Sequence, residues 1–264
     1  MQRETAEAVT ALAARLYPEN PPRLHFHPQC FDRYGHFAGT DEVRTDAFVD
    51  VANDPMIDAV WIGRGGYGAS RLIETILPRL GPAASAKSYL GYSDGGSLLG
   101  ALYSQGFGGV AHGPVAQDLL RQGGESAVTR ALDWLVRRDL DALEATVGPT
   151  PAAAFNLCIL SHLIGTPWQP DLSGHVLMLE EVSEYMYRID RDLTHVLANT
   201  NIRQVAGVRL GRVSDVPAND PAFGLDEVEV FEQACARAGV PYLGRADIGH
   251  DVSNKVVPFG AAWR

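Results

Sequence analysis

The sequence predicts an α/β fold with two domains, an N-terminal domain built on a parallel sheet and a smaller C-terminal α/β domain. The chain has 264 residues, and at roughly 100–200 residues per domain this length suits one large or two modest domains. Strand-like and helix-like apolar patterns alternate along it, as in βαβ units. A Pro-, Thr- and Ala-rich stretch from Thr146 to Ala154 is typical of a linker. We therefore expect domains over 1–145 and 157–264, joined by a linker over 146–156.

The first half supplies helices and strands in turn. Apolar residues at helical spacing predict helices over 3–16, over 41–53 and from Arg71 to Leu77, the last ending near Pro78. Extended apolar runs predict strands over 57–62, 88–92 and 109–112, with a helix through Leu98–Tyr103 between the second and third. Helices that link successive strands imply a mostly parallel sheet.

The second half repeats this alternation. Its apolar pattern predicts helices around Leu157–Ile164, over 185–197 and over 226–238, and strands over 175–179, 205–210 and 241–243. We therefore expect a second α/β unit, with an active site in the cleft between the two domains.

Composition excludes several classes of protein. Hydrophobic residues make up 46% and charged residues 20% of the chain, as in an ordinary soluble globular protein. The net charge of −10 argues against non-specific binding to nucleic acid or to an anionic membrane. Cys30, Cys158 and Cys235 are odd in number and far apart, so we expect reduced thiols, without a disulfide framework or a zinc cluster. No export segment is evident, and we expect a cytoplasmic protein.

A G-x-S-x-G pattern, Gly91-Tyr92-Ser93-Asp94-Gly95, lies between a predicted strand and a predicted helix. Small flanking residues let the chain turn so sharply that the serine oxygen projects from the sheet, with the next backbone N–H directed to the same spot. The alternative is a serine that caps a helix. The strand–turn–helix context favours a nucleophile elbow, with Ser93 as the nucleophile.

A second glycine-rich segment, Gly63–Gly68, follows the strand ending at Ile62. Unhindered N–H groups at the start of a helix favour an anion: a phosphate, a carboxylate or an oxyanion. The spacing fits neither the Rossmann pattern nor Walker A, so nucleotide binding is weakly supported. Both glycine loops should meet at the carboxyl edge of the sheet. There Arg64 or Arg71 could hold a substrate carboxylate, or could form a surface ion pair instead.

A nucleophilic serine needs a base, and His250 is the best candidate among the histidines. It lies in the late loop Ile248-Gly249-His250-Asp251, whose neighbours leave it free to project into a cleft. His112, at the end of a predicted strand, is the rival. We expect His112 to line the pocket rather than to act as the base.

The orienting acid should be a carboxylate at a strand end. Glu180 directly follows the apolar run Leu177–Leu179 and is preferred over Glu181 and Glu184. Glu184 stands four residues before Arg188, the favourable order for a plain helical ion pair. The triad would then assemble from both domains in the chain order Ser, Glu, His.

Several motifs occur together in one order along the chain. They are Arg64-Gly65-Gly66-Tyr67-Gly68 with Arg71-Leu72, Gly91-Tyr92-Ser93-Asp94, His112-Gly113-Pro114, Gly165-Thr166-Pro167, Leu179-Glu180-Glu181, Tyr187-Arg188-Ile189-Asp190-Arg191, and Gly249-His250 with Pro258-Phe259-Gly260. The set closely resembles the LD-carboxypeptidase family, the muramoyltetrapeptide carboxypeptidases. The resemblance extends from about residue 38 to the C-terminus and is far more specific than any one motif.

The resemblance implies a two-domain serine peptidase that removes the terminal D-alanine from L-Ala-γ-D-Glu-meso-diaminopimelate-D-Ala in cytoplasmic peptidoglycan recycling. It implies the nucleophile Ser93, the base His250 and the acid Glu180, with no metal or cofactor. The implied oxyanion donors are the N–H groups of Asp94 and of a glycine in the Gly65-Gly66 loop, for which we take Gly66. The residues expected at the substrate are Gly65, Arg64, Arg71 and His112.

This chain departs from the family pattern in two places. Family members usually open with a Val- and Ala-rich strand and a Ser-Pro turn, whereas this sequence starts at the following helix. Asp94 is followed by Gly95-Gly96, where the family more often has a β-branched or threonine pair. The second departure concerns the rigidity of the elbow and not its chemistry.

Two other functions stay open. A related hydrolase, similar to the microcin-immunity carboxypeptidases, would cut an amide to an aminoacyl nucleotide, and an aromatic platform for the base, from Trp61 or Trp168, would favour it. A non-catalytic protein would bind an anion or a peptide at the glycine loop. In each case the expected partner is a small molecule rather than nucleic acid or a membrane, and a homodimer stays open.

Overall fold

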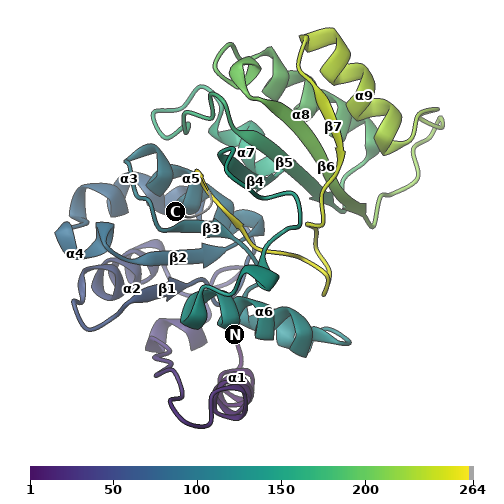
Figure 1. Ribbon diagram of the computed structural model, residues 1–264. Helices are drawn as coiled ribbons and strands as arrows, with labels where there is room; N and C mark the ends of the chain where they lie inside the picture. Colours follow the sequence, from purple (N-terminus) through teal and green to yellow (C-terminus); the bar gives the residue numbers. More distant parts are fainter. Residues whose placement is uncertain (262–264) are drawn as a thin grey trace.

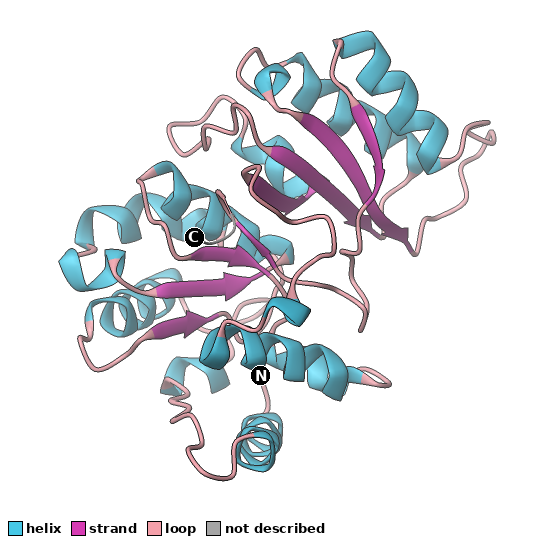
Figure 2. Cartoon of the chain, in the orientation of Figure 1, coloured by secondary structure: helices cyan, strands magenta, loops and turns pink. Residues whose placement is uncertain are grey.

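The computed structural model describes residues 1–261, which form two four-stranded sheets flanked by helices (Figures 1 and 2). The first sheet has the order β1-β2-β3-β8 and the second the order β4-β5-β6-β7. The strands are β1 Ala59–Trp61, β2 Ser88–Gly91, β3 Val110–His112, β4 Ala152–Asn156, β5 Val176–Val182, β6 Gly207–Ser214, β7 Tyr242–Arg245 and β8 Val257–Pro258. The helices are α1 Arg3–Leu16, α2 Asp41–Asn53, α3 Ile73–Ile76, α4 Pro82–Ser85, α5 Gly96–Ser104, α6 Gly124–Arg137, α7 Leu157–Leu163, α8 Met186–Ala198 and α9 Glu227–Ala238. The predicted α/β class is confirmed.

All strand pairs are parallel except the pair of β3 with β8. The predicted helix from Arg71 to Leu77 is broken into a 3₁₀ turn, the short α3 and a second 3₁₀ turn that contains Pro78. Proline has no N–H to continue an α-helix, which explains why α3 ends before Pro78. α6 was not predicted, although Val128 and Leu132 give it a buried apolar stripe.

The second sheet begins inside the segment predicted as a linker. β4 spans Ala152–Asn156, and all five of its residues are buried. Three alanines between prolines and a helix suggest a linker by composition, but here their backbone pairs with β5 and, at Ala152, with the C-terminal segment. Their side chains are buried on both faces of the sheet. The last five residues of the predicted linker therefore belong to the sheet.

Alternate residues of the first sheet face different helices. Tyr89 packs in the cluster that contains residues of α2 and α5, whereas Leu90 packs with Ala131 and Trp134 of α6. This alternation follows from the two-residue period of a strand. The sheet is thus covered on both faces, as parallel sheets usually are.

The second sheet has a different layer on each face. Leu177 and Leu179 of β5 pack with α8 and α9, while Met178 packs with Ile248 and Val257 on the other face. Helices cover one face (Figure 1), and Ala246 and Ile248, which follow β7, pack on the other. Because neighbouring residues of a strand point to opposite faces, the side chains of Glu180 and Glu181 near the end of β5 lie on opposite faces of the sheet.

The C-terminal end of the chain returns to the first sheet. In β8, Val257 and Pro258 pair antiparallel with His112 and Ala111 of β3. Figure 1 shows the yellow end of the chain crossing from the second sheet to β3. One cluster of buried apolar side chains also runs through both sheets. Among the described residues, every helix is too short or too polar to span a bilayer.

Candidate active site

Ser93 has the backbone geometry that a nucleophile elbow requires. It lies two residues after the end of β2, has a φ of +58° and begins the 3₁₀ turn Ser93–Gly95 that leads into α5. A positive φ is uncommon for a residue with a side chain and is often found at functional sites. Gly91 and Gly95 are needed for packing, because a Cβ on either would lie 2.8 or 2.9 Å from Ile62 side-chain atoms. The glycines of the pattern thus let the turn sit on β1.

Two consecutive hydrogen bonds join Ser93, His250 and Glu180, the three side chains that the sequence favours for catalysis. His250 Nε2 lies 3.0 Å from Ser93 Oγ, and His250 Nδ1 lies 2.6 Å from Glu180 Oε2. With Nδ1 protonated, His250 donates to the carboxylate, and Nε2 can accept the serine proton. Glu180 is fully buried at the end of β5, on the sheet face covered by the His250 loop.

The surroundings of His250 favour its charged form. Burial by itself lowers the pKa of the imidazole, but the hydrogen bond and charge of Glu180 offset it, so that the pKa is raised. The Tyr92 ring lies 4.9 Å from the imidazole, and the Tyr92 hydroxyl donates to Asp118 at 2.9 Å. This ring restricts how the imidazole can turn.

Residues that sequence reasoning did not single out hold the loop of His250. Asn254 is fully buried, and its Oδ1 accepts the Gly249 N–H at 3.2 Å. Arg130 of α6 donates to the carbonyl oxygens of Val252 and Asn254 at 3.2 and 2.6 Å. Arg212 of β6 pairs with Asp247 and Asp251. Arg130 and Arg212 are distant from this loop in the sequence, so no local pattern indicates them.

The glycine loop lies against the elbow. A Cβ on Gly65 would come within 3.2 Å of Ser93 Oγ, and Gly66 has a φ of +107°. Burial raises the pKa of the Asp94 carboxyl, while the N–H groups of Asp94 and Gly66 both lower it. The N–H groups of Asp94 and Gly66, which we expect to be the oxyanion donors, therefore both point toward the Asp94 carboxylate. The two groups face the same small region.

The two candidate arginines differ. Arg71 donates from Nε to Asp41 at 2.8 Å and lies over the Phe37 ring, so it forms the surface ion pair that was its alternative. Arg64 is exposed beside the elbow and has neither an ion pair nor a hydrogen bond to another residue within 1–261. Of the two, Arg64 is the one available to a substrate carboxylate.

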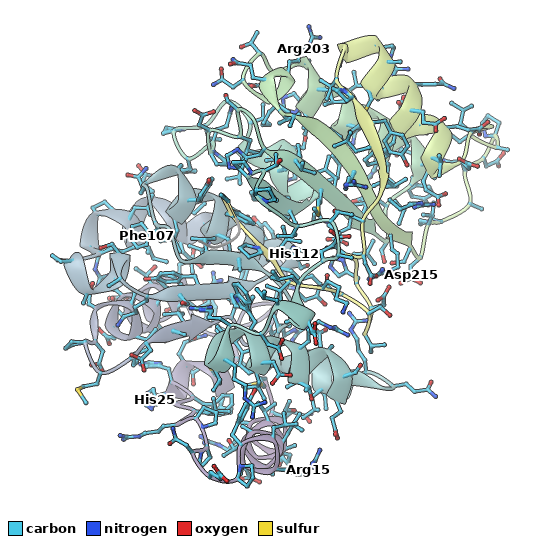
Figure 3. The ribbon with its side chains drawn as sticks, in the orientation of Figure 1. Arg15, His25, Phe107, His112, Arg203 and Asp215 are labelled. Carbon is cyan, nitrogen blue, oxygen red and sulfur yellow. The ribbon has the colours of Figure 1, made fainter. Side chains whose placement is uncertain are left out.

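His112 does not line a pocket, contrary to the sequence expectation. Its exposure is 1%, and its Nε2 lies 3.0 Å from Asn254 Oδ1. Figure 3 labels His112 among the side chains of the molecule. Burial lowers its pKa to about 4. Because β8 covers the end of β3, this strand end faces the interior. His112 supports the loop of His250 through Asn254.

The other two carboxylates have separate partners. Glu184 pairs with Arg188 at 3.3 Å, as its spacing predicted. Glu181 is buried on the helix face and accepts the Cys158 N–H at 2.9 Å. Burial raises its pKa to about 7. Within residues 1–261, Glu180 is the carboxylate that contacts His250.

Comparison with known proteins gives the same family from both halves of the chain. A model of the LD-carboxypeptidase N-terminal domain matches residues 2–113, and a model of the C-terminal domain matches residues 152–264. The chain belongs to the LD-carboxypeptidase family. It is accordingly a serine-type carboxypeptidase, and the resemblance found in its motifs is confirmed.

Curated relatives cover most of this carboxypeptidase. A putative carboxypeptidase of Synechocystis is 34% identical over 238 residues, covering 87% of this chain and 77% of its own length. The murein tetrapeptide carboxypeptidase of Pseudomonas aeruginosa is 30% identical over 249 residues, covering 86% of this chain and 78% of its own length.

Solved structures share the fold of this carboxypeptidase. The muramoyltetrapeptide carboxypeptidase of Oxalobacter formigenes superposes with a TM-score of 0.78 at 24% identity, covering 98% of this chain and 90% of the other. The microcin C7 self-immunity protein MccF, in complex with aspartyl sulfamoyl adenosine, superposes with a TM-score of 0.76 at 17% identity, covering 97% and 87%. At these identities the likeness concerns the fold.

The tryptophans considered as a platform for a nucleobase are both engaged in packing. Trp61 donates from Nε1 to the Pro114 carbonyl at 2.8 Å and packs against two apolar clusters. Trp168 packs against the main apolar cluster. Neither packing arrangement favours the aminoacyl-nucleotide alternative.

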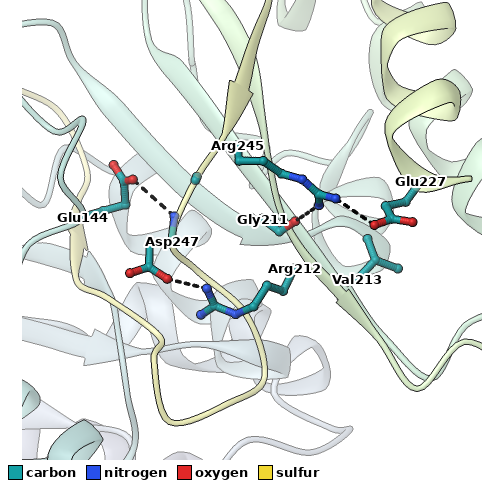
Figure 4. Close-up of a pocket in the computed structure, with 8 residues that line it drawn as sticks. Glu144, Gly211, Arg212, Val213, Glu227, Arg245 and Asp247 are labelled. Carbon is teal, nitrogen blue, oxygen red and sulfur yellow. Dashed lines mark hydrogen bonds and ion pairs between the residues drawn. The ribbon is translucent and has the colours of Figure 1, made fainter.

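A cavity of about 480 Å³ lies beside Glu180, and neither Ser93 nor His250 is among its lining residues. Figure 4 shows two ion pairs in its lining, Arg245 with Glu227 and Arg212 with Asp247, and a hydrogen bond from the Asp247 N–H to Glu144. Gly211, at its edge, is packed against the β-carbon of Glu180. The cavity therefore adjoins the strand residue that packs against Glu180. In the described part of the chain, no group of three or more metal-ligating side chains is placed to hold a metal.

Proposed function

We propose that this carboxypeptidase releases the terminal D-alanine from the tetrapeptide L-Ala-γ-D-Glu-meso-diaminopimelate-D-Ala in cytoplasmic peptidoglycan recycling. The observation that carries the proposal is the continuous line from Glu180 through His250 to Ser93, with both hydrogen-bond distances at 3.0 Å or less. The murein tetrapeptide activity in the name of the Pseudomonas relative supports the substrate.

The chemistry follows from the positions of three atoms. His250 Nε2 takes the proton from Ser93 Oγ while Oγ attacks the carbonyl carbon of the diaminopimelate residue. The imidazolium, stabilised by Glu180, then gives this proton to the D-alanine nitrogen as the C–N bond breaks. In the second half, His250 takes a proton from water, the hydroxide attacks the acyl-enzyme, and the proton returns to Ser93.

Two backbone groups stabilise the charge that develops on the carbonyl oxygen. These are the N–H of Asp94, which follows the nucleophile, and the N–H of Gly66, whose loop lies against Ser93. Donors fixed before the reaction need no reorganisation in the transition state. The Asp94 carboxylate, which both groups face, must move aside when the substrate oxygen takes its place.

A carboxypeptidase also has to recognise the free carboxylate at the end of its substrate. We assign this contact to Arg64, because it is exposed beside the glycine loop without an ion-pair partner in residues 1–261. An arginine can bind a carboxylate with two parallel hydrogen bonds. The carboxylate of D-alanine is the group that tells a chain end from an internal peptide bond.

The test is release of free D-alanine, measured by mass spectrometry after incubation of the full chain with the diaminopimelate tetrapeptide. Wild type should release it, and Ser93→Ala and His250→Ala should each lose several orders of magnitude in kcat. A Ser93→Ala variant with the wild-type rate would refute the assignment. If folded wild type is inactive on the tetrapeptide but cuts an aminoacyl sulfamoyl nucleotide, the alternative function replaces it.

A serine-directed fluorophosphonate separates both enzymes from a non-catalytic binding protein. Labelling at Ser93 that disappears in His250→Ala indicates an activated serine. A folded wild type that binds the tetrapeptide but neither cuts it nor takes up the label would support binding alone.

A further inference from the structure

The end of β5 carries two buried carboxylates that face opposite layers, and the mechanism uses one of them. Glu180 contacts His250 on the loop face, whereas Glu181 is 3% exposed on the helix face. Glu181 Oε1 accepts the Asn156 amide N–H at 2.6 Å and the Val182 N–H at 2.9 Å. Its Oε2 accepts the Cys158 N–H at 2.9 Å. All three partners are N–H donors, which suits an ionised carboxylate.

These bonds fasten the first turn of α7. Asn156, the last residue of β4, accepts the Ile159 N–H at 3.1 Å and so caps the helix. Since Asn156 also donates to Glu181, two linked side chains satisfy two of the free N–H groups at this helix start. Asn156 is in register with Glu180. The helix start is therefore tied to the strand end that carries the acid.

The fastened helix lies on the helix that follows the nucleophile. A Cβ on Gly96 would lie 3.5 Å from Ile159, and a Cβ on Gly100 would lie 2.7 Å from Leu163. Two glycines thus let α7 approach the backbone of α5, which starts three residues after Ser93. Glu181 is thus connected to Ser93 through two helices: it binds the start of α7, and α7 packs on α5.

We propose that Glu181 is a positioning residue: it holds α7 on α5 and so fixes the separation between Ser93 and the pair His250–Glu180. This inference rests on the proposed function of the triad. Interiors are packed so closely that a shift of α7 is passed on to α5. A misplacement of about 1 Å can cost roughly a hundred-fold in rate, so this role affects kcat more than KM.

The charge of Glu181 also reaches the base. An ionised Glu181 raises the pKa of His250, in addition to the larger effect of Glu180. Burial raises the pKa of Glu181 itself to about 7, so this charge is present above that pH and is lost where the acid limb of kcat/KM falls. The titratable and charged groups around Glu181, the start of α7 and His250 are Glu180, Cys158, His162, Asp94, Glu184, Asp192 and Arg121.

The test compares Glu181→Gln with the matched control Glu184→Gln, in the full chain with the tetrapeptide. The amide that replaces the carboxylate would present an N–H to another N–H donor, and we expect kcat to fall about ten- to a hundred-fold with KM within about two-fold. The rate of labelling by a fluorophosphonate should fall in parallel with kcat. The control, whose carboxylate pairs with Arg188 in the wild type, should match wild type in kcat, KM and labelling rate.

Glu181→Asp is the second variant, for the case that Glu181→Gln does not fold. The shorter side chain keeps a carboxylate but cannot span to both Asn156 and the Cys158 N–H, so kcat should again fall. Wild-type kcat and labelling rate in either folded variant would overturn the inference.

Ser93→Ala, run in parallel, distinguishes this failure from failure of the proposed function. If Ser93→Ala is inactive and Glu181→Gln is like wild type, only the role of Glu181 is wrong. If Ser93→Ala is active, the triad itself is wrong, and the role of Glu181 falls with it.

Discussion

Gly65 lies so close to Ser93 that a side chain cannot be added there without moving Ser93. A Cβ on Gly65 would lie 2.9 Å from the Ser93 Cβ and 3.2 Å from Oγ. Real Cβ atoms essentially never approach another heavy atom to less than 3.0 Å. The glycine loop and the elbow are therefore fitted to each other.

Gly65→Ala should reduce kcat strongly at little cost in stability. The methyl group would displace the serine oxygen from His250 or move the Gly66 N–H, and loss of one oxyanion donor costs about a hundred- to a thousand-fold. Steady-state kinetics with the tetrapeptide check this, with thermal unfolding as the control for folding. Gly63→Ala is the matched variant, because a Cβ there meets nothing closer than 3.8 Å. Equal kcat values for Gly65→Ala and Gly63→Ala would contradict the close contact between Gly65 and Ser93.

Glu180→Gln should lower kcat by about a thousand- to ten-thousand-fold, as loss of the acid does in other triads. It should also move the acid limb of kcat/KM. Burial lowers the pKa of His250 and Glu180 raises it, so removal of the charge lowers the pKa. Since the base must be neutral, the residual activity should extend to lower pH. A pH–rate profile measures this, and an unmoved limb would argue against Glu180 as the partner.

His112 should make the fold sensitive to acid. Its pKa falls from 6.5 to about 4 on burial, so the unfolded chain binds more protons between these values. Stability should therefore drop as the pH falls through this window, by roughly 2 kcal/mol at pH 5 from this group. Urea unfolding at pH 7.5 and pH 5 measures the drop. His112→Gln, which does not titrate, should show a smaller one, and an equal drop would exclude His112 as its source.

Arg64→Ala should raise KM for the tetrapeptide more than it lowers kcat. Loss of a charge-assisted contact to a carboxylate corresponds to about 1.5–3 kcal/mol, or roughly ten- to a hundred-fold. Arg71→Ala is the comparison, because Arg71 is paired with Asp41 and should have a smaller effect. A larger effect of Arg71→Ala would reverse the assignment. A C-terminal amide of the tetrapeptide should be a poor substrate for wild type and should reduce the difference made by Arg64→Ala.

Sequence patterns were informative where the signal is local. The turn around Ser93 follows from glycines two residues before and after it, and Glu180 follows from its place at the end of an apolar run. The helical ion pair of Glu184 with Arg188 follows from spacing alone. In these cases the residues that decide the structure are neighbours in the chain.

Other features depend on residues that are distant in sequence. His112 is buried because β8 pairs with β3 about 145 residues later, and a strand of two residues has no recognisable period. Asn254 and Arg212 carry no motif, although they hold the loop of His250. The sequence predicts a linker where the structure has β4, because three alanines show neither strand nor helix periodicity.

The return of β8 to the first sheet also determines when the enzyme can be completed during synthesis. Until Val257 and Pro258 leave the ribosome, the emerged N-terminal half exposes the edge of β3 that they will pair with. Ser93 is made 157 residues before His250, so no chain that ends before His250 contains the hydrogen-bonded set of Ser93, His250 and Glu180. Expression of residues 1–145 alone would thus give a protein with an open sheet edge, whereas adding the C-terminal segment closes it.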